Sequence, residues 1–139
     1  MKALQVRGKN KIDKVWTHGN GIYVDDKTSA IVDVIVYNDE NNERCVTSRH
    51  IEIVPETAGQ YIDKMDRKHR RIFEGDIIKA QVFCDYEVHE QIFVVKRGEY
   101  GFEPFVEQYT CNGCDCEFTL QEIEVIGNIH DNPELLDRI

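Results

Sequence analysis

The chain has 139 residues, of which 41% are hydrophobic and 31% are charged, so it has enough apolar material for one compact domain or two small lobes. Its 17 basic and 26 acidic residues give a net charge of −9, and a field of that sign disfavours nucleic acid as a partner. No apolar run approaches the roughly 18 residues of a membrane span, and the first residues lack the apolar core of a secretion signal. We therefore expect a cytoplasmic protein with no membrane partner.

The first half of the chain alternates short predicted strands with turns. Hydrophobic and β-branched segments predict strands over residues 3–7, 14–16, 21–24, 31–37, 44–47 and 50–54. Asn20-Gly21 is predicted to be the turn between the second and third of these strands. The Asn/Asp-rich segment 38–42 predicts the turn of a hairpin between the fourth and the fifth.

Apolar residues thin out between Pro55 and Arg71, which predicts a connection with one helical turn over residues 60–65. We place a lobe boundary in this stretch. The prediction is an N-terminal β-rich lobe over residues 1–60 and a C-terminal lobe over residues 61–139, with one shared core as the alternative.

In the second half, strands are predicted over residues 76–83, 88–95, 102–106, 117–120 and 124–129. Five short strands within about 60 residues favour a small barrel or curled sheet of SH3 or OB size over an open sheet. Asn132 followed by Pro133 predicts a short C-terminal helix with the asparagine as N-cap, whose Leu135 and Leu136 dock on the sheet. The expected fold class is therefore mainly β, with a β-rich N-terminal lobe, a curled C-terminal sheet or barrel and a short C-terminal helix.

Three cysteines stand within six residues of one another: Cys111, Cys114 and Cys116. A Cys-x-x-Cys pair is a common source of two thiolate ligands for tetrahedral zinc, and Gly113 can provide the turn between them. The fourth ligand is missing locally, and Cys84, His89 or a second chain are the candidates for it. The alternative is a loop of reduced thiols that binds nothing. We expect no cofactor, with zinc at these cysteines as the alternative.

Five basic residues gather between positions 64 and 71: Lys64, Arg67, Lys68, Arg70 and Arg71. Clustered positive charge is what a nucleic-acid surface requires, because cations engage phosphates and neighbouring rings stack on bases. Aromatic residues are poorly interleaved here and the chain is acidic as a whole, so a solvated connection is the favoured interpretation. A nucleic-acid site at these five residues stays open as the alternative.

The segment Glu74-Gly75-Asp76 stands directly before an apolar strand and can be mistaken for a pair of catalytic acids. Gly75 is better explained as a turn or bulge residue, and Asp76 as an acceptor for nearby backbone amides. General acid–base chemistry also needs a concave site and a second positioned group, and no motif in the chain supplies them. We therefore expect no catalytic residue and a protein that is not an enzyme.

Three motifs follow one another along the chain: Gly59-Gln60-Tyr61, then Ile72-Phe73-Glu74-Gly75-Asp76-Ile77-Ile78, and finally Ile126-Gly127-Asn128-Ile129 with Asn132-Pro133-Glu134-Leu135. In this order they resemble the YopX family of small phage and prophage proteins. The resemblance implies a mostly β protein in a bacterial cytoplasm and implies no activity. The chain departs from the family pattern at Lys68-His69, where an Asn-Gly-type turn is usual, and in its three clustered cysteines.

The leading functional hypothesis is a non-enzymatic accessory protein that acts through protein–protein contacts or self-assembly. A homo-oligomer is expected because the edges of a strand-rich chain must be paired or covered, and any other protein partner is unknown. The runner-up is a small-barrel module that binds nucleic acid through the basic segment 64–71. A third hypothesis, from the enzyme class, is a zinc site at the three cysteines that activates water.

Overall fold

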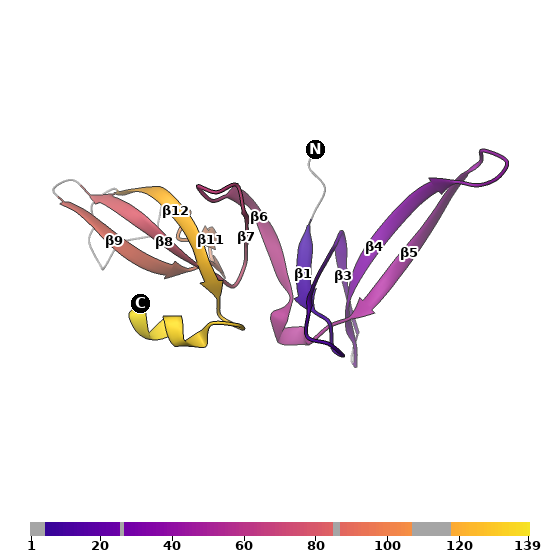
Figure 1. The fold of residues 1–139 in the computed structure, drawn as a ribbon, viewed down its shortest axis with the longest axis horizontal. Coiled ribbons are helices and arrows are strands. Elements are labelled where there is room, and N and C mark those ends of the chain that lie inside the picture. The colour runs from indigo at the N-terminus through magenta and orange to yellow at the C-terminus, as the bar shows by residue number, and fades with distance from the viewer. Residues whose placement is uncertain (1–4, 26, 85–86, 107–117) are drawn as a thin grey trace. The chain divides into compact units, whose positions relative to one another are not determined.

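The computed structural model describes residues 5–25, 27–84, 87–106 and 118–139, which form a mostly β protein (Figure 1). The chain divides into two compact units, Met1–Tyr61 and Ile62–Ile139. Strands dominate both units, so the prediction of a mainly β fold is confirmed. No helix in the described part of the chain has the length and hydropathy that crossing a bilayer demands.

The first unit contains β1 (Val6–Lys9), β2 (Trp16–Gly19), β3 (Gly21–Val24), β4 (Ser29–Asn38), β5 (Arg44–Glu52) and the 3-10 helix η1 (Pro55–Thr57). β1 pairs with β2 and with the first residues of β6 (Gly59–Met65), while β3, β4 and β5 form a second sheet in that order. Val6, Ile31 and Ile53, each at most 3% exposed, form the core of this unit. Apolar residues of β1, of β4 and of the segment after β5 therefore hold the unit together.

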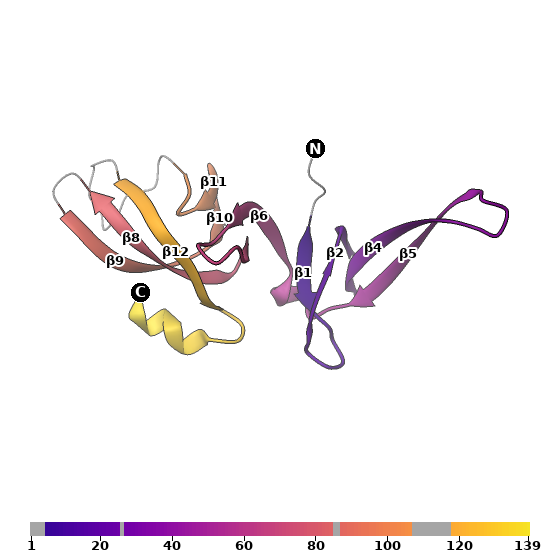
Figure 2. The same cartoon turned by 45° about the horizontal axis from the view of Figure 1, so that its top comes forward.

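β4 and β5 continue past this core as a two-stranded ribbon (Figure 2). Their register is unbroken over nine residue pairs, and the Asp39 carboxylate accepts hydrogen bonds from two backbone amides in the turn. β3 pairs with β4 only as far as Val32. We name the remaining part of the ribbon, residues 33–38 and 44–49, the arm.

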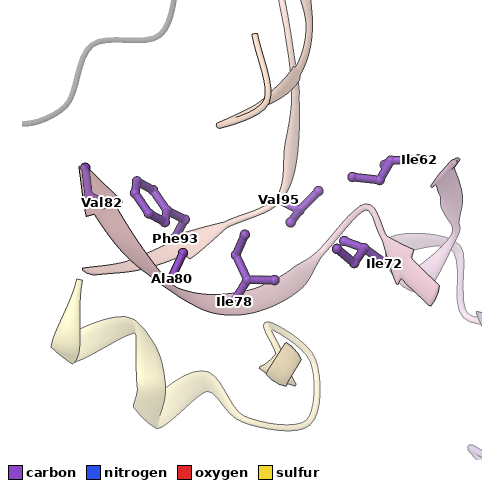
Figure 3. Close-up of a cluster of buried hydrophobic side chains, with 7 residues drawn as sticks. All are labelled: Ile62, Ile72, Ile78, Ala80, Val82, Phe93 and Val95. Carbon is purple, nitrogen blue, oxygen red and sulfur yellow. The ribbon is translucent and has the colours of Figure 1, made fainter. Parts of the chain in front are cut away.

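The second unit contains the end of β6, then β7 (Arg71–Phe73), β8 (Asp76–Cys84), β9 (Glu87–Val94), β10 (Lys96–Gly98), β11 (Gly101–Glu103) and β12 (Phe118–Asn128). β8 lies between β12 and β9, β6 pairs with β7, and β10 pairs with β11. Ile78, Ala80 and Val82 point to one face of β8 because side chains alternate along a strand. They belong to a buried cluster with four further residues, drawn in Figure 3: Ile62, Ile72, Phe93 and Val95.

No barrel closes among the described residues, so the curled sheet of the prediction is observed and the closed barrel is not. The predicted C-terminal helix is present as the 3-10 helix η3 (Pro133–Arg138), with Asn132 at its N-cap position as predicted. The Asn132 side chain makes no capping hydrogen bond and instead accepts a hydrogen bond from the Asn128 amide at 3.2 Å. Of the two leucines expected to dock, Leu135 is half-buried and Leu136 is exposed.

The chain bends at Asn20 between β2 and β3, where the turn is predicted, but the two strands pair with different neighbours because Asn20 anchors to β4 through its amide and its side chain. Two other predicted local structures are wrong for identifiable reasons. The predicted helical turn over residues 60–65 is strand β6, whose start pairs with β1. The predicted strands 117–120 and 124–129 are one strand, β12, which two register shifts interrupt.

Candidate functional site

The basic segment predicted as a connection is a β-hairpin, formed by the end of β6, a turn and the start of β7. We name residues 64–71 the basic hairpin. Asp66 organises its turn, because its buried Oδ1 accepts hydrogen bonds at 2.9 Å from the backbone amides of Lys68 and Arg70. Its Oδ2 accepts from Arg70 Nε at 3.1 Å and from the Val125 amide in β12 at 3.0 Å. One carboxylate therefore closes the turn and attaches it to β12.

The local environment of Asp66 favours its charged form. Burial acts to raise the pKa of the Asp66 carboxyl, but the hydrogen bonds from the amides of Val125, Arg70 and Lys68 and the nearby Arg70 charge outweigh burial. The pKa of Asp66 therefore lies below its ordinary value. The backbone amide of Arg67 adds a second link to β12, since it donates to the Ile123 carbonyl at 2.8 Å.

The five basic residues are on one hairpin, and acidic or aromatic groups of the second unit contact several of them. Arg67 lies 3.3 Å from Glu122, and Lys68 lies 2.9 Å from Glu124. The carboxylate of Glu124 also lies 3.6 Å from Arg70. Lys64 and Arg71 complete the hairpin, with the Lys64 ammonium 5.4 Å from the ring centre of Phe105.

These contacts reduce the positive field that the hairpin presents. The Lys68 ammonium beside it holds the pKa of the Glu124 carboxyl below its ordinary value, so this carboxylate stays charged at neutral pH. Exposed ion pairs contribute little to stability, but the carboxylates of Asp66, Glu122 and Glu124 still offset neighbouring cations. The arrangement is that of a structural charge network more than of an open phosphate track.

The second and third family motifs meet at the start of β8, where the chain turns from β7. Gly75 has a φ of +92°, which permits the turn between β7 and β8, and the Asp76 carboxylate accepts a hydrogen bond from the Phe73 amide at 2.8 Å. Both roles confirm the structural interpretation of this segment. The carbonyl of Gly75 then accepts from the Ile129 amide at 2.9 Å, which joins this turn to the segment after β12.

The terminal motif is also a folded turn. The side-chain oxygen of Asn128 accepts hydrogen bonds from the amides of His130 and Asp131, at 3.0 and 2.9 Å. A Cβ added to Gly127 would lie 2.5 Å from Asn132 Oδ1, so only glycine allows this close approach. Backbone geometry and turn hydrogen bonds therefore explain the second and third motifs, and the first motif is the part of β6 that pairs with β1.

Cys111, Cys114 and Cys116, the predicted zinc ligands, lie outside the described residues. The two nearby candidates for a fourth ligand both lie on the β8–β9 hairpin, where Cys84 is opposite Glu87 and His89 is opposite Val82. The ring of His89 contacts the Gln91 side chain, with Nε2 3.1 Å from Oε1. Within the described ranges no group of three His, Cys, Asp or Glu side chains is placed to hold a metal ion.

The arm is the surface that the sequence did not reveal. Its apolar side chains Val34, Ile35, Val36, Tyr37 and Val46 are between 42% and 64% exposed, although they alternate between the two faces of the ribbon. Their run of β-branched residues predicts a strand correctly, but such runs usually indicate a strand that is buried on both faces. These side chains are exposed because no other described element covers them. Residue types alone do not predict whether a strand is covered.

The two faces of the arm differ in charge. One face carries the cross-strand ion pair between Asp33 and Arg49, at 3.5 Å. The other face pairs Val34 with Ser48 and Val36 with Val46, four uncharged side chains in adjacent rows, and carries Arg44 opposite Asn38 in the next row toward the turn. The four uncharged side chains can lose water without burying a charge.

The YopX protein family model matches residues 5–137 of the chain. No curated protein and no solved structure matches it. The match includes both units and all three motifs whose turns and pairings are described here. The chain therefore belongs to the YopX family.

Proposed function

We propose that the protein is a non-enzymatic accessory protein of a phage or prophage, which acts in the bacterial cytoplasm by binding protein chains through the arm. The phage origin and the compartment rest on the family resemblance. The observation that carries the binding role is the exposure of Val34, Ile35, Val36 and Tyr37 on both faces of a two-stranded ribbon. A ribbon of two strands is marginally stable in water by itself, and contiguous exposed apolar surface is typical of interaction sites.

The alternative proposal is a nucleic-acid-binding module that uses the basic hairpin. Its support is the grouping of Lys64, Arg67, Lys68, Arg70 and Arg71 on one hairpin. The neighbouring Glu122 and Glu124 carboxylates and the net charge of −9 weigh against it, because phosphate binding would have to displace or overcome them. The rows Val34–Ser48 and Val36–Val46 of the arm include no charged side chain that a partner would have to displace, so we favour protein binding.

Site-specific photocrosslinking in cells tests the proposed role of the arm. A photoreactive phenylalanine analogue replaces Val36, which is 53% exposed, or Val88, an equally β-branched residue that is 60% exposed on β9 of the second unit. We expect covalent protein adducts from position 36 only, with the linked chain identified by mass spectrometry of its peptides. Adducts from neither position, or equal adducts from both, would contradict the proposal.

A further inference from the structure

We infer that the outer edge of β5 binds a second copy of this chain, which adds its own β5 as an antiparallel neighbour. The inference rests on the proposed function, since it names one partner of the arm. It follows from the direction of backbone groups along β5, from the limited protection of this edge in the described part of the chain and from the distribution of charge along the arm.

The hydrogen bonds at the base of β5 show which of its residues face outward. The Ile53 amide donates to the Ser29 carbonyl at 2.9 Å, so the backbone N–H and C=O groups of odd-numbered residues are directed toward β4. The Glu52 carbonyl is directed away from β4 and accepts from the Lys11 amide at 3.0 Å. Backbone groups alternate in direction along an antiparallel strand. Lys11 therefore occupies the outer edge at Glu52, and four more residues direct their backbone groups outward along it: Arg44, Val46, Ser48 and His50.

In the described part of the chain, this edge lacks most of the usual protection against strand addition. Folded proteins shield edge strands with prolines, bulges, short length, charged side chains or inward-pointing charges. β5 is nine residues long, is the last strand of the order β3-β4-β5, and keeps an unbroken register with β4. Its central residues, from Val46 to Ser48, carry neither a charge nor a proline. A second strand therefore meets an edge whose three central residues carry no charge, with Arg44 and Arg49 on either side of them.

One antiparallel register uses the whole outward edge. A two-fold axis through Thr47 pairs Arg44 with His50 of the other copy, and Val46 with Ser48, so that all four outward residues find outward partners. A shift toward the base of the strand brings the second copy onto Lys11, which already binds Glu52. A shift toward the turn leaves His50 without a partner from the second copy. The register centred on Thr47 is therefore the one we propose.

The distribution of charge along the arm favours the antiparallel orientation of a second copy. The turn at the end of the arm is acidic, with Asp39, Glu40 and Glu43, while at its base Lys11 and Lys14 stand with Asp13 and Glu52, so that the charges there nearly balance. An antiparallel second copy places each acidic turn beside this balanced segment of the other chain and far from the other acidic turn. A parallel copy would bring the two acidic turns together, in a chain that already carries a net charge of −9.

Pairing also accounts for how the arm is stabilised. Two ribbons joined through β5 form a four-stranded sheet, and three or more strands with an apolar face are the usual requirement for a stable sheet. Because the two-fold axis is perpendicular to the sheet, the faces that carry Val36 and Val46 in the two copies lie on the same side. That widened face stays accessible to another protein, as the proposed function requires.

Disulfide trapping tests the register directly in the full chain. Residues at a non-hydrogen-bonded antiparallel pair have Cα atoms about 4.5 Å apart, within the range for a disulfide. In a Cys45→Ser background, Thr47→Cys should therefore form an intermolecular disulfide under mild oxidation, located between the two position-47 thiols by peptide mapping. Ser48→Cys is the matched control, because its two thiols lie more than about 7 Å apart at the Cα atoms in this register.

A linked dimer from Thr47→Cys and none from Ser48→Cys supports the inference. Linkage from Ser48→Cys alone, or from neither variant, overturns it. Adding Ser48→Pro to the Thr47→Cys chain should abolish the linkage, because proline removes an outward N–H without removing a bond to β4. If linkage is absent while position 36 still crosslinks to a different protein, this inference fails and the proposed function stands.

Discussion

At the scale of single residues, the Asp66 carboxylate closes the turn of the basic hairpin and joins it to β12. This carboxylate accepts hydrogen bonds from three backbone amides and from the Arg70 guanidinium. Asp66→Asn would turn an NH2 group toward some of these donors, so we expect a loss of about 3 kcal/mol in the free energy of unfolding. Urea unfolding measures it, with Asp137→Asn in the exposed η3 helix as the control that should change stability little. Equal stability of the two variants would contradict this role.

The same carboxylate predicts how stability depends on pH. A group whose pKa is lower in the folded chain than in the unfolded chain stabilises the fold above its unfolded pKa, and this contribution is lost as pH falls through the folded pKa. We expect the free energy of unfolding to fall as pH drops below about 4, the ordinary pKa of aspartate. The fall should be shallower in Asp66→Asn, when both chains are unfolded by urea at several pH values. Parallel curves for both chains would contradict the prediction.

Substitutions at His69 test the effect of the departure from the family pattern on stability. Its φ of 61° lies in the left-handed region, which costs residues other than glycine roughly 1–2 kcal/mol. The resemblance indicates that the family usually places an Asn-Gly-type turn here. We expect His69→Gly to raise the free energy of unfolding by about 0.5–1 kcal/mol, the gain that remains after the added flexibility of the unfolded chain. His69→Ala keeps the strained backbone and should give no gain, so equal effects of the two substitutions would refute the role of backbone strain.

A substitution at Gly127 tests the close approach between this residue and Asn132 in the terminal motif. Gly127→Ala brings a Cβ within 2.5 Å of Asn132 Oδ1, and Asn132 cannot move without losing its hydrogen bond to the Asn128 amide. We expect a loss of about 1–3 kcal/mol in the free energy of unfolding, as for other overpacked sites. Gly21→Ala is the control, because nothing lies within 4 Å of the added atom. Thermal unfolding of the two variants compares them, and a tolerated Gly127→Ala would show that the turn adjusts.

At the scale of elements, the basic hairpin separates the two functional proposals. We expect the full chain to show no binding to labelled single- or double-stranded DNA or RNA that weakens steeply with salt, measured by fluorescence anisotropy. The triple variant Arg67→Ala, Arg70→Ala and Arg71→Ala should behave like the parent chain. Salt-sensitive binding that disappears in the triple variant would contradict protein binding as the main role and support the nucleic-acid alternative.

The sequence predicts elements better than it predicts their partners. Strand β8 and the turn at Gly75 follow from local patterns, because alternating apolar residues favour a strand and a glycine before an aspartate favours a turn. The pairing of β6 with β1 and the contact of Asp66 with Val125 join residues far apart in the chain. Local propensity contains no information on such pairing, so the sequence predicts a helical turn where β6 lies.

The candidate sites show the same limit. The grouping of basic residues on one hairpin is visible in the sequence, because they are close along the chain. Their pairing with Glu122 and Glu124 depends on the irregular part of β12, where Glu122 has a φ of 54° and the register shifts. The exposure of the arm is likewise invisible in the sequence, since its valines and isoleucine resemble those of a buried strand.

At the scale of the whole molecule, different parts of the chain have different tasks. The family motifs build turns and strand pairs, the basic hairpin is held by carboxylates, and the arm extends beyond the core of its unit with apolar side chains exposed. The exposed valines contribute little to the stability of the single chain, because they bury little surface. Their contribution is expected to appear only when a second protein chain is bound.

The most direct test of this claim is a native mass spectrum of the untagged full chain beside that of its Ser48→Pro variant, recorded over a range of protein concentrations. We expect a dimer, about twice the 16.2 kDa of one chain, for the parent protein and a single chain for the variant. A parent protein of 16.2 kDa at every concentration, or a dimer that persists in Ser48→Pro, would contradict pairing of the arms through β5.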